Sequence, residues 1–271
     1  NKDPFDNSVS YNLKIFSFDK QSKFNYPITS IAQTKDHTYW LGTNFGMLQV
    51  QDLKKEKATL FQSNNDKLNT LSSNQITKII TDKTGNVWIS SFGGGVDLLD
   101  LNQKKFYTLS HDPLSKNTLS GKYIRAVEED LNGHIWIATQ DNGINILDSI
   151  SKKITYLNKS NGLSSNFVRC IEKDLRGRMW IGYSEQGIDV YDMGKIHHIN
   201  ANELSNGTIF SLSTDVFGNI WAGSWINGLN VIRYKSSKDY QIQKIYHHQK
   251  LISDDAVTFV YADKGSPEVF V

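Results

Sequence analysis

The chain has 271 residues, of which 38% are hydrophobic and 21% are charged, enough for a domain with a sizeable core. Lysine and arginine number 30 against 28 for aspartate and glutamate, so the net charge of +2 gives no electrostatic support for binding nucleic acid. The single cysteine, Cys170, excludes an internal disulfide framework and a CxxC metal or redox site. No run of 18 apolar residues predicts a membrane span, and the polar stretch 1–10 does not resemble a signal peptide.

A tryptophan recurs along the chain at spacings of 48, 48, 44 and 41 residues. The tryptophans in this register are Trp40, Trp88, Trp136, Trp180 and Trp221. Four copies of the motif D-x-x-G-x-[VIM]-W end on them and begin at Asp82, Asp130, Asp174 and Asp215. A shorter version without the glycine runs from Asp36 to Trp40. A period of 20–50 residues indicates a repeat architecture.

Each repeat predicts four short antiparallel strands. In the second repeat the first strand is ITKII (76–80), a turn runs from Asp82 to Gly85, and the second strand carries Trp88. Aspartate at the first position and glycine at the fourth are typical of a type I turn that joins a tight hairpin. A third strand with alternating hydrophobicity follows a glycine-containing loop, and the stretch KFYTLS (105–110) supplies the fourth.

Four antiparallel strands every 40 to 50 residues, with one large aromatic side chain at a fixed place, are the signature of a β-propeller. A single small sheet cannot bury both of its faces, whereas stacked blades can, with the tryptophan filling the wedge between neighbours. We therefore predict an all-β fold, one β-propeller domain over residues 1–271 with about five full four-stranded blades and a partial sixth. In chain order the blades are expected near 24–62, 72–110, 120–158, 164–200, 205–247 and 252–271.

The two ends of the sequence predict a piece of a larger propeller. The sixth repeat stops after its second strand, VFV (269–271), and has Phe270 where the other repeats have tryptophan. The stretch YNLKIFSF (11–18) is expected to be the fourth strand of a preceding blade. An open ring has unpaired strand edges, which favour association, so a homodimer is an expected assembly.

The motif resembles the two-component regulator propeller repeat, and lacks the closing Trp-Asp of WD40 blades and the paired glycines of kelch. Its best copies are ITKIITDKTGNVWISSFGGGVDLLD, IRAVEEDLNGHIWIATQDNGINILD and VRCIEKDLRGRMWIGYSEQGIDVYD. The stretches HDPLSKNTLSGKYI (111–124) and NKSNGLSSNFV (158–168) also resemble inter-blade segments of that family. The resemblance covers about residues 24–265.

The resemblance implies the extracytoplasmic sensor region of a hybrid two-component system of Bacteroides-type bacteria. Such a region is the periplasmic portion of an inner-membrane protein whose other parts hold a transmembrane helix and a histidine kinase. These sensors often report carbohydrates or their breakdown products. The implied partner is therefore an oligosaccharide or another small ligand, with no cofactor and no catalysis in this segment.

The expected ligand site lies at one end of the blades. Because strand direction alternates, the loops between blades and those between second and third strands share one face of the disc, and the D-x-x-G turns lie on the other. Ligands bind where loops converge, so we place the site on the first face. Its candidate residues are Phe92, Tyr123, Arg125, Gln140, Asp141, Phe167, Arg169, Glu185 and Trp225, with Asn44 in an equivalent loop.

Trp225 is the strongest candidate because Trp221 already has the inter-blade position of its repeat. An exposed indole provides a surface on which a sugar ring can stack, with arginine, glutamine and aspartate as hydrogen-bond partners for hydroxyl groups. Arg125 and Arg169 stand at equivalent positions and are expected to form a basic rim. The alternatives are that Trp225 packs on a neighbouring loop and that the arginines bond neighbouring blade carbonyls.

The remaining chemistry-bearing residues do not predict catalysis. The repeated aspartates are one per blade and are expected to be held by their own backbone, too far apart for the paired carboxylates of hydrolysis. The pairs His197-His198 and His247-His248 fall on outer strands and are expected to be solvated, and neighbours on a strand point to opposite faces, which disfavours metal binding. Cys170 is expected to be a small buried hydrophobe.

Three functions remain open at this point. The leading one is a non-catalytic sensor that recognises a glycan. The second is a propeller lyase of the streptogramin-lyase type, which needs a cluster of histidine and glutamate near the channel mouth. The third is a scaffold that docks another protein or dimerises.

Overall fold

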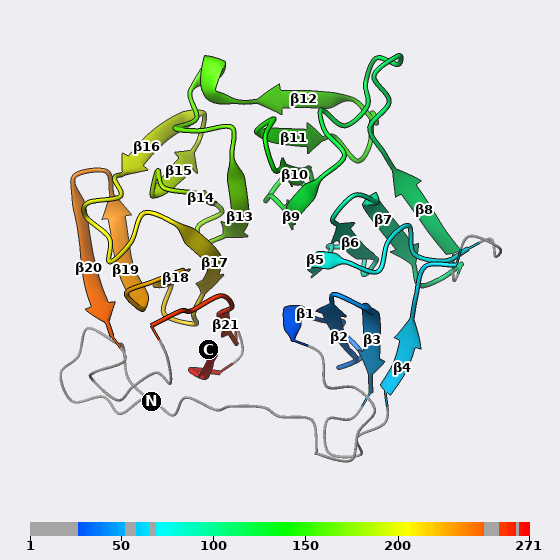
Figure 1. Cartoon of the computed structure of the whole chain (residues 1–271), viewed down its shortest axis with the longest axis horizontal. Helices are drawn as coiled ribbons and strands as arrows, with labels where there is room; N and C mark the ends of the chain where they lie inside the picture. Colours follow the sequence, from blue (N-terminus) through cyan, green and yellow to red (C-terminus); the bar gives the residue numbers. More distant parts are fainter. Residues whose placement is uncertain (1–26, 52–57, 65–68, 104, 247–254, 264–265) are drawn as a thin grey trace. The chain divides into compact units, whose positions relative to one another are not determined.

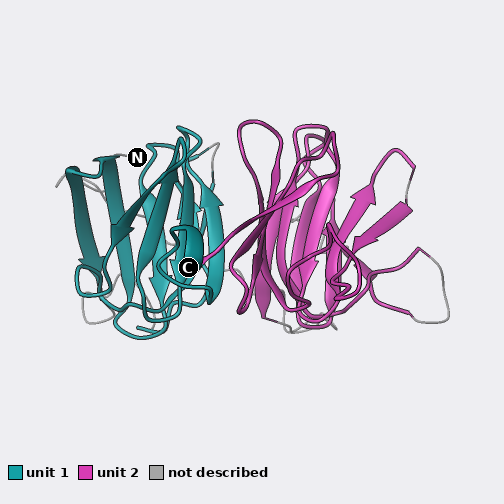
Figure 2. Cartoon of the chain, turned by 90° about the horizontal axis from the view of Figure 1, so that it is seen from above, with its two compact units in different colours: residues 1–16, 159–271 teal, residues 17–158 magenta. Residues whose placement is uncertain are grey.

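The structure is a computed structural model and describes residues 27–51, 58–64, 69–103, 105–246, 255–263 and 266–271 (Figure 1). Over these residues it contains β-strands and one short 3-10 helix, Lys159–Asn161, and no α-helix. The chain divides into two compact units, residues 17–158 and residues 1–16 with 159–271 (Figure 2). The stretch 11–18 and the pair His247-His248 lie outside the described residues.

The unit 17–158 contains three four-stranded antiparallel sheets, each with its strands in sequence order. The first blade consists of β1 (Ile28–Gln33), β2 (Tyr39–Thr43), β3 (Gly46–Val50) and β4 (Ala58–Phe61). The second consists of β5 (Ile76–Thr81), β6 (Val87–Ser91), β7 (Gly95–Asp100) and β8 (Lys105–Leu109). The third consists of β9 (Ile124–Glu129), β10 (Ile135–Thr139), β11 (Ile144–Leu147) and β12 (Ile154–Leu157).

The unit that holds 159–271 contains two more four-stranded sheets and one two-stranded sheet. The fourth blade consists of β13 (Val168–Lys173), β14 (Met179–Tyr183), β15 (Ile188–Asp192) and β16 (Lys195–Ile199). The fifth consists of β17 (Ile209–Thr214), β18 (Ile220–Ser224), β19 (Leu229–Ser236) and β20 (Asp239–Ile245). The last sheet pairs β21 (Tyr261–Ala262) with β22 (Val269–Phe270). The all-β prediction of four-stranded antiparallel blades is confirmed.

Four of the repeated tryptophans fill the space between consecutive blades of one unit, as predicted. Trp40 packs with Ile79 and Ile89 of the second blade, and Trp88 packs in the same way with residues of the third blade. Trp180 belongs to a core cluster with Leu212 of the fifth blade. Trp221 packs against the two-stranded sheet. Burial of a large aromatic side chain at each interface is therefore a main source of stability for the stack.

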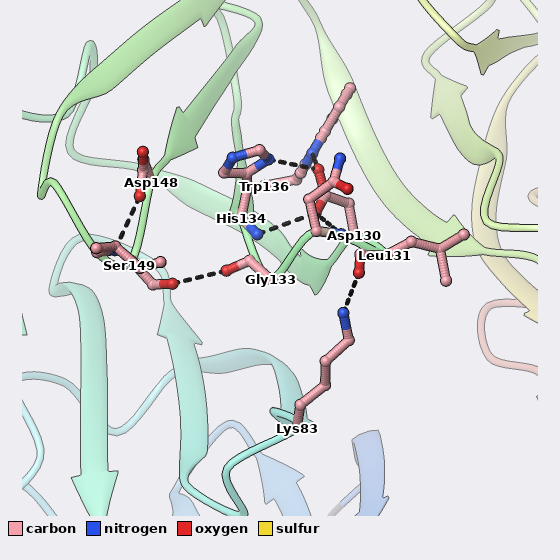
Figure 3. Close-up of polar contacts among 10 residues, drawn as sticks. Lys83, Asp130, Leu131, Gly133, His134, Trp136, Asp148 and Ser149 are labelled. Carbon is pink, nitrogen blue, oxygen red and sulfur yellow. Dashed lines mark hydrogen bonds and ion pairs between the residues drawn. The ribbon is translucent and has the colours of Figure 1, made fainter.

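The D-x-x-G aspartate holds both its turn and its tryptophan, as Figure 3 shows for Asp130. Asp130 Oδ1 accepts hydrogen bonds from the backbone N–H groups of Asn132 (2.8 Å) and His134 (2.9 Å), and Oδ2 accepts one from Trp136 Nε1 (3.1 Å). Burial alone would raise the pKa of Asp130, but the hydrogen bonds from His134 and Trp136 outweigh it and lower the pKa below its usual value.

The same arrangement recurs in three other blades. The tryptophan Nε1 donates to an aspartate oxygen at 2.8 Å in the pair Trp88–Asp82, and at 3.0 and 2.9 Å in the fourth and fifth blades. Neighbouring turns are also joined, since Lys83 Nζ donates to the carbonyl oxygen of Leu131 (Figure 3). These aspartates therefore hold the backbone of their own turns, as the sequence predicted.

The first blade corrects the prediction that its turn motif begins at Asp36. Strand register pairs Gln33 with Tyr39 and Ala32 with Trp40, which places Thr34, not Asp36, at the position of the other turn aspartates. His37 has φ of 63° and so adopts the left-handed conformation that glycine has in the other turns. Trp40 Nε1 consequently has no hydrogen-bond partner among the described residues, although it is buried.

We expect the double substitution Thr34→Asp/Asp36→Thr to stabilise the protein by about 1 kcal/mol, because it supplies the missing acceptor for a buried N–H group. The double substitution moves the carboxylate and does not add one, so the turn never holds two negative charges. It copies the second blade, where the Thr84 hydroxyl donates to the Asp82 carboxylate at 2.6 Å. Thermal unfolding measures the gain. A Trp40→Phe background removes the N–H group, and an equal gain there would contradict this explanation.

A second repeated contact holds the segments that lead into the second, third, fourth and fifth blades. The backbone N–H of a serine donates to a buried Asp or Asn on the third strand, at 2.7 to 2.9 Å and always 25 residues away. The pairs are Ser72–Asp97, Ser120–Asn145, Ser164–Asp189 and Ser205–Asn230. Each serine follows a buried leucine, which explains the Leu-Ser of the inter-blade stretches. We call this contact the serine latch; it fixes the loop from which the first strand begins.

The last sheet confirms that Phe270 stands at the tryptophan position. Tyr261 pairs with Phe270, as Ile80 pairs with Trp88 in the second blade. The backbone N–H of Asp263 donates to the carbonyl oxygen of Glu268 at 2.9 Å, one residue further along than in the other turns, so this turn is longer by one residue.

The structure confirms one prediction about buried side chains and corrects another. Cys170 is buried, and its thiol donates to the carbonyl oxygen of Ile209 at 3.7 Å. The prediction that His197 is solvated is wrong, because its ring is half-buried against Tyr234 and Tyr240, with centroids 5.8 and 5.6 Å away. Burial lowers the pKa of His197. The neighbouring His198 is exposed, as expected.

Candidate functional site: two arginine–aromatic clusters

In the unit 17–158, four of the predicted site residues meet at one end of the second and third blades. Phe92 follows β6 and stacks on Tyr123, which precedes β9, with ring centroids 4.7 Å apart and planes at 28°. Arg125 on β9 places its guanidinium carbon 4.8 Å from the Phe92 centroid. Arg125 Nη2 also donates to Gln140 Oε1 at 2.6 Å. We call these four residues the Arg125 cluster.

The other unit contains a similar arrangement, the Arg169 cluster, in its fourth and fifth blades. Trp225 follows β18 and stacks on Phe210 of β17, with centroids 5.1 Å apart and planes at 23°. Arg169 on β13 places its guanidinium carbon 4.1 Å from the Phe210 centroid. Arg169 Nε donates to Ser184 Oγ at 2.6 Å. Each cluster thus combines a stacked aromatic pair with an arginine lying on one ring.

The chemistry of both clusters suits recognition of a ligand with hydroxyl groups and an apolar ring face. Each arginine bonds a side chain of its own blade, which fixes the plane of the guanidinium. Burial lowers the pKa of Arg169, yet an arginine side chain stays charged in proteins. Trp225 is 52% exposed, so one part of its ring faces solvent while the other packs on Phe210. The sequence allowed two interpretations of Trp225, an exposed stacking surface and a packed side chain, and each describes one part of the ring.

The other candidate residues have exposed side chains, and all but Asn44 lie within two residues of a cluster member in sequence. Asp141 follows Gln140 and accepts a hydrogen bond from Asn142 at 2.7 Å. Glu185 follows Ser184 with a φ of 70°, and its backbone N–H donates to Thr208 Oγ1 at 3.2 Å. The remaining exposed candidates are Phe167, which precedes β13, and Asn44, which follows β2.

Sequence reasoning missed Phe210, on which both Trp225 and Arg169 pack. The signal was present, because Phe210 is the second residue of its first strand. The equivalent residues of the other four-stranded blades are Thr29, Thr77, Arg125 and Arg169. An aromatic residue at a position that is polar in the other blades is therefore the sequence signal for this contact.

A serine, a histidine and an aspartate also meet in the fourth blade, but not in the geometry of a catalytic triad. His198 Nδ1 lies 2.5 Å from Asp189 Oδ1 and 2.7 Å from Ser164 Oγ. In a catalytic triad one ring nitrogen of the histidine contacts the serine and the other contacts the aspartate. Here Nδ1 makes both contacts. Tyr183 also donates to Asp189 at 2.6 Å, and burial together with that carboxylate raises the pKa of the phenol. These hydrogen bonds to Asp189 therefore support the serine latch of the fourth blade.

Comparison with known proteins agrees with this architecture. Residues 70–93 match the family model described as two component regulator propeller. No curated protein sequence matches the chain. Among the described residues, no helix is long and apolar enough to cross a membrane.

Several solved structures have the same fold. The extracellular domain of the hybrid two component system BT4673 from B. thetaiotaomicron is 25% identical, with a TM-score of 0.66 over 82% of this chain and 31% of that one. The corresponding domain of BT3049 from the same organism is 17% identical, with a TM-score of 0.65 over 96% and 41%. Virginiamycin B lyase from Staphylococcus aureus is 16% identical, with a TM-score of 0.62 over 89% and 76%.

This chain therefore spans less than half the length of the two B. thetaiotaomicron domains. The five tryptophan repeats, the blades that they form and the match at residues 70–93 lead to one conclusion. The chain has the fold of a β-propeller, and its residues 70–93 match the two-component regulator propeller repeat.

Proposed function

We propose that the chain is a non-catalytic, extracytoplasmic sensor propeller of a hybrid two-component system, and that it recognises a glycan or a glycan breakdown product. The likeness to extracellular domains of such systems supports the sensor role and the periplasmic location. The Arg169 cluster is the observation that favours a glycan. Its half-exposed indole offers a stacking surface, and the arginine on Phe210 offers hydrogen-bond donors for hydroxyl or carboxylate groups.

The positions of the histidines favour a sensor over a lyase. Of the described histidines, His197 and His198 lie on β16, the outermost strand of the fourth blade. His37 and His134 lie in the turns between first and second strands, and His111 lies in the loop after β8. His111 lies in the inter-blade loop that also carries Tyr123, but its Nδ1 contacts the carbonyl oxygen of Leu119 at 2.5 Å, and none of these five imidazoles is a member of either arginine–aromatic cluster.

Binding of oligosaccharides to the whole chain tests this proposal. We expect calorimetry with a panel of neutral and acidic oligosaccharides to find at least one saturable ligand. Trp225→Ala is expected to weaken its affinity about tenfold or more, which corresponds to about 1.4 kcal/mol, because an anchoring tryptophan carries much of the energy of an interface. Tyr107→Ala is the matched control, since Tyr107 is also a half-exposed aromatic residue but lies on the outer strand β8.

Three results would contradict the proposal. A chain that binds no member of the panel but forms a defined dimer would instead be a docking scaffold. Equal weakening by Trp225→Ala and Tyr107→Ala would remove the Arg169 cluster from the site. Consumption of virginiamycin B, followed by chromatography, would show a lyase.

A further inference from the structure

A cationic pocket lies at the opposite end of the blades from the Arg169 cluster. It is a cavity of about 250 Å³ within the unit that holds 159–271. Its lining comes from the turn after β13, the turn after β17 and the last residues of β19. Arg169 is near the start of β13 and Asp174 directly follows its end. The cluster and the pocket therefore lie at opposite ends of this strand.

Positive charge dominates the lining of this pocket. Four cationic side chains line it, together with one carboxylate, Asp174. They are Arg176, Arg178, Arg233 and Lys235. Asp174 is already engaged by Arg178, whose Nε lies 2.5 Å from Asp174 Oδ2, and Lys235 Nζ lies 3.4 Å from the exposed Asp239. The lining thus holds four positive charges and one negative charge, an excess of three before Asp239 beside Lys235 is counted.

The arginines are a feature of this turn and not of the repeat. The fourth blade reads Asp-Leu-Arg-Gly-Arg, with arginine at the second and fourth positions after the aspartate. The corresponding pairs in the other three D-x-x-G turns are Thr84 and Asn86, Asn132 and His134, and Phe217 and Asn219. Asn219 shows that a neutral side chain can also bond the turn aspartate, at 3.0 Å. The turn geometry therefore does not account for the positive charge.

The guanidinium of Arg178 is rigidly held at the wall. It is buried, its Nη2 donates to the carbonyl oxygen of Tyr234 at 3.2 Å, and its carbon lies 4.6 Å from the centroid of the Tyr234 ring. Leu175 and Phe217, both half-exposed, supply apolar walls. With its partner Asp174, Arg178 forms a rigid, neutralised wall. The exposed side chains of Arg176 and Lys235 supply positive charge next to the apolar surfaces, which suits an anionic group carried on a small ring.

We propose that this pocket binds the anionic group of a monosaccharide-sized ligand, a carboxylate or a sulfate ester on a sugar ring. The site is separate from the two arginine–aromatic clusters and does not depend on the function proposed for them. The excess positive charge supplies the attraction, and the volume of about 250 Å³ accommodates one sugar ring.

Calorimetry on the whole chain with glucuronate, glucose 6-sulfate, glucose and inorganic sulfate tests the inference. We expect saturable 1:1 binding of at least one of the two anionic sugars, with affinity falling as salt is added, and none of glucose. Arg176→Gln/Lys235→Gln is expected to weaken the affinity at least about tenfold, because it removes two charges from the lining while leaving the buried Asp174–Arg178 pair intact. Lys105→Gln, an exposed lysine on β8, is the matched control.

The outcomes separate the possibilities. Loss of binding in the double variant with retention in Lys105→Gln supports the pocket, and circular dichroism of each variant verifies the fold. Equal weakening by Lys105→Gln would show general charge attraction and overturn the site. Binding of inorganic sulfate as tight as that of the anionic sugars would overturn the role of the ring. Absence of binding by both anionic sugars would overturn the proposal altogether, whether or not an oligosaccharide binds at the Arg169 cluster.

Discussion

Trp180→Ala is expected to lower the free energy of unfolding by about 3–5 kcal/mol. The Trp180 side chain is fully buried, at 0% exposure, and packs in one cluster with Leu212, Ile220 and Ala222 of the next blade. Its ring also meets Tyr234 edge to face, with centroids 5.3 Å apart. The truncation removes these contacts and leaves a cavity at the interface between two blades, where the strands on both sides are too constrained to collapse.

Chemical denaturation measures this loss, and Trp225→Ala provides the comparison. Trp225 is 52% exposed and makes its ring contact mainly with Phe210, so its truncation should cost only a small part of the Trp180 effect. Equal losses for the two substitutions would mean that the in-register tryptophans are not the principal contact between blades.

Asp174→Ala is expected to cost a similar amount, about 3–5 kcal/mol, for an electrostatic reason. Asp174 and Arg178 form an ion pair at 2.5 Å whose side chains are only 1% and 6% exposed. Removing the carboxylate leaves the guanidinium buried without its counter-ion. It also removes the acceptor for Trp180 Nε1, at 3.0 Å, and for the backbone N–H groups of Arg176 and Arg178.

Two variants isolate the charge from the hydrogen bonds. Asp82→Ala removes the same kind of bonds, to Trp88 Nε1 and to two backbone N–H groups, from a turn that holds no buried arginine. Its expected cost is about 1–3 kcal/mol. Arg178→Asn copies the Asn219–Asp215 pair and should also be mild. If Asp82→Ala destabilises the protein as much as Asp174→Ala, the uncompensated arginine is not the cause.

The blades were predictable from sequence because their information is local. A strand, a tight turn and a buried tryptophan recur within each repeat, so five copies confirm one another. The first turn shows the limit of matching residue types. Asp36 was assigned to the turn position by its identity, whereas the pairing of Gln33 with Tyr39 assigns that position to Thr34. Strand register cannot be read from a side chain alone when the turn residues differ.

The candidate site was predictable only in part, because its contacts cross between blades. Alternating strand direction predicts which loops share one face, and Phe92, Tyr123 and Arg125, which that argument placed on one face, pack together in the structure. The contact of Arg169 with Phe210, by contrast, joins first strands of neighbouring blades 41 residues apart. It depends on how two sheets pack, and no spacing within one repeat encodes it.

The serine latch has a consequence for how the chain folds and how such propellers change in size. Each latch closes a segment of only 25 residues, so the entropy lost in forming it is that of a short loop. Every hydrogen bond of the latch lies within one repeat, and a repeat can therefore order itself before its neighbours do. The interface tryptophans then add nearest-neighbour cooperativity, as in linear repeat proteins. Whole repeats can be gained or lost in evolution without breaking a latch, provided that the exchange begins at the Leu-Ser pair.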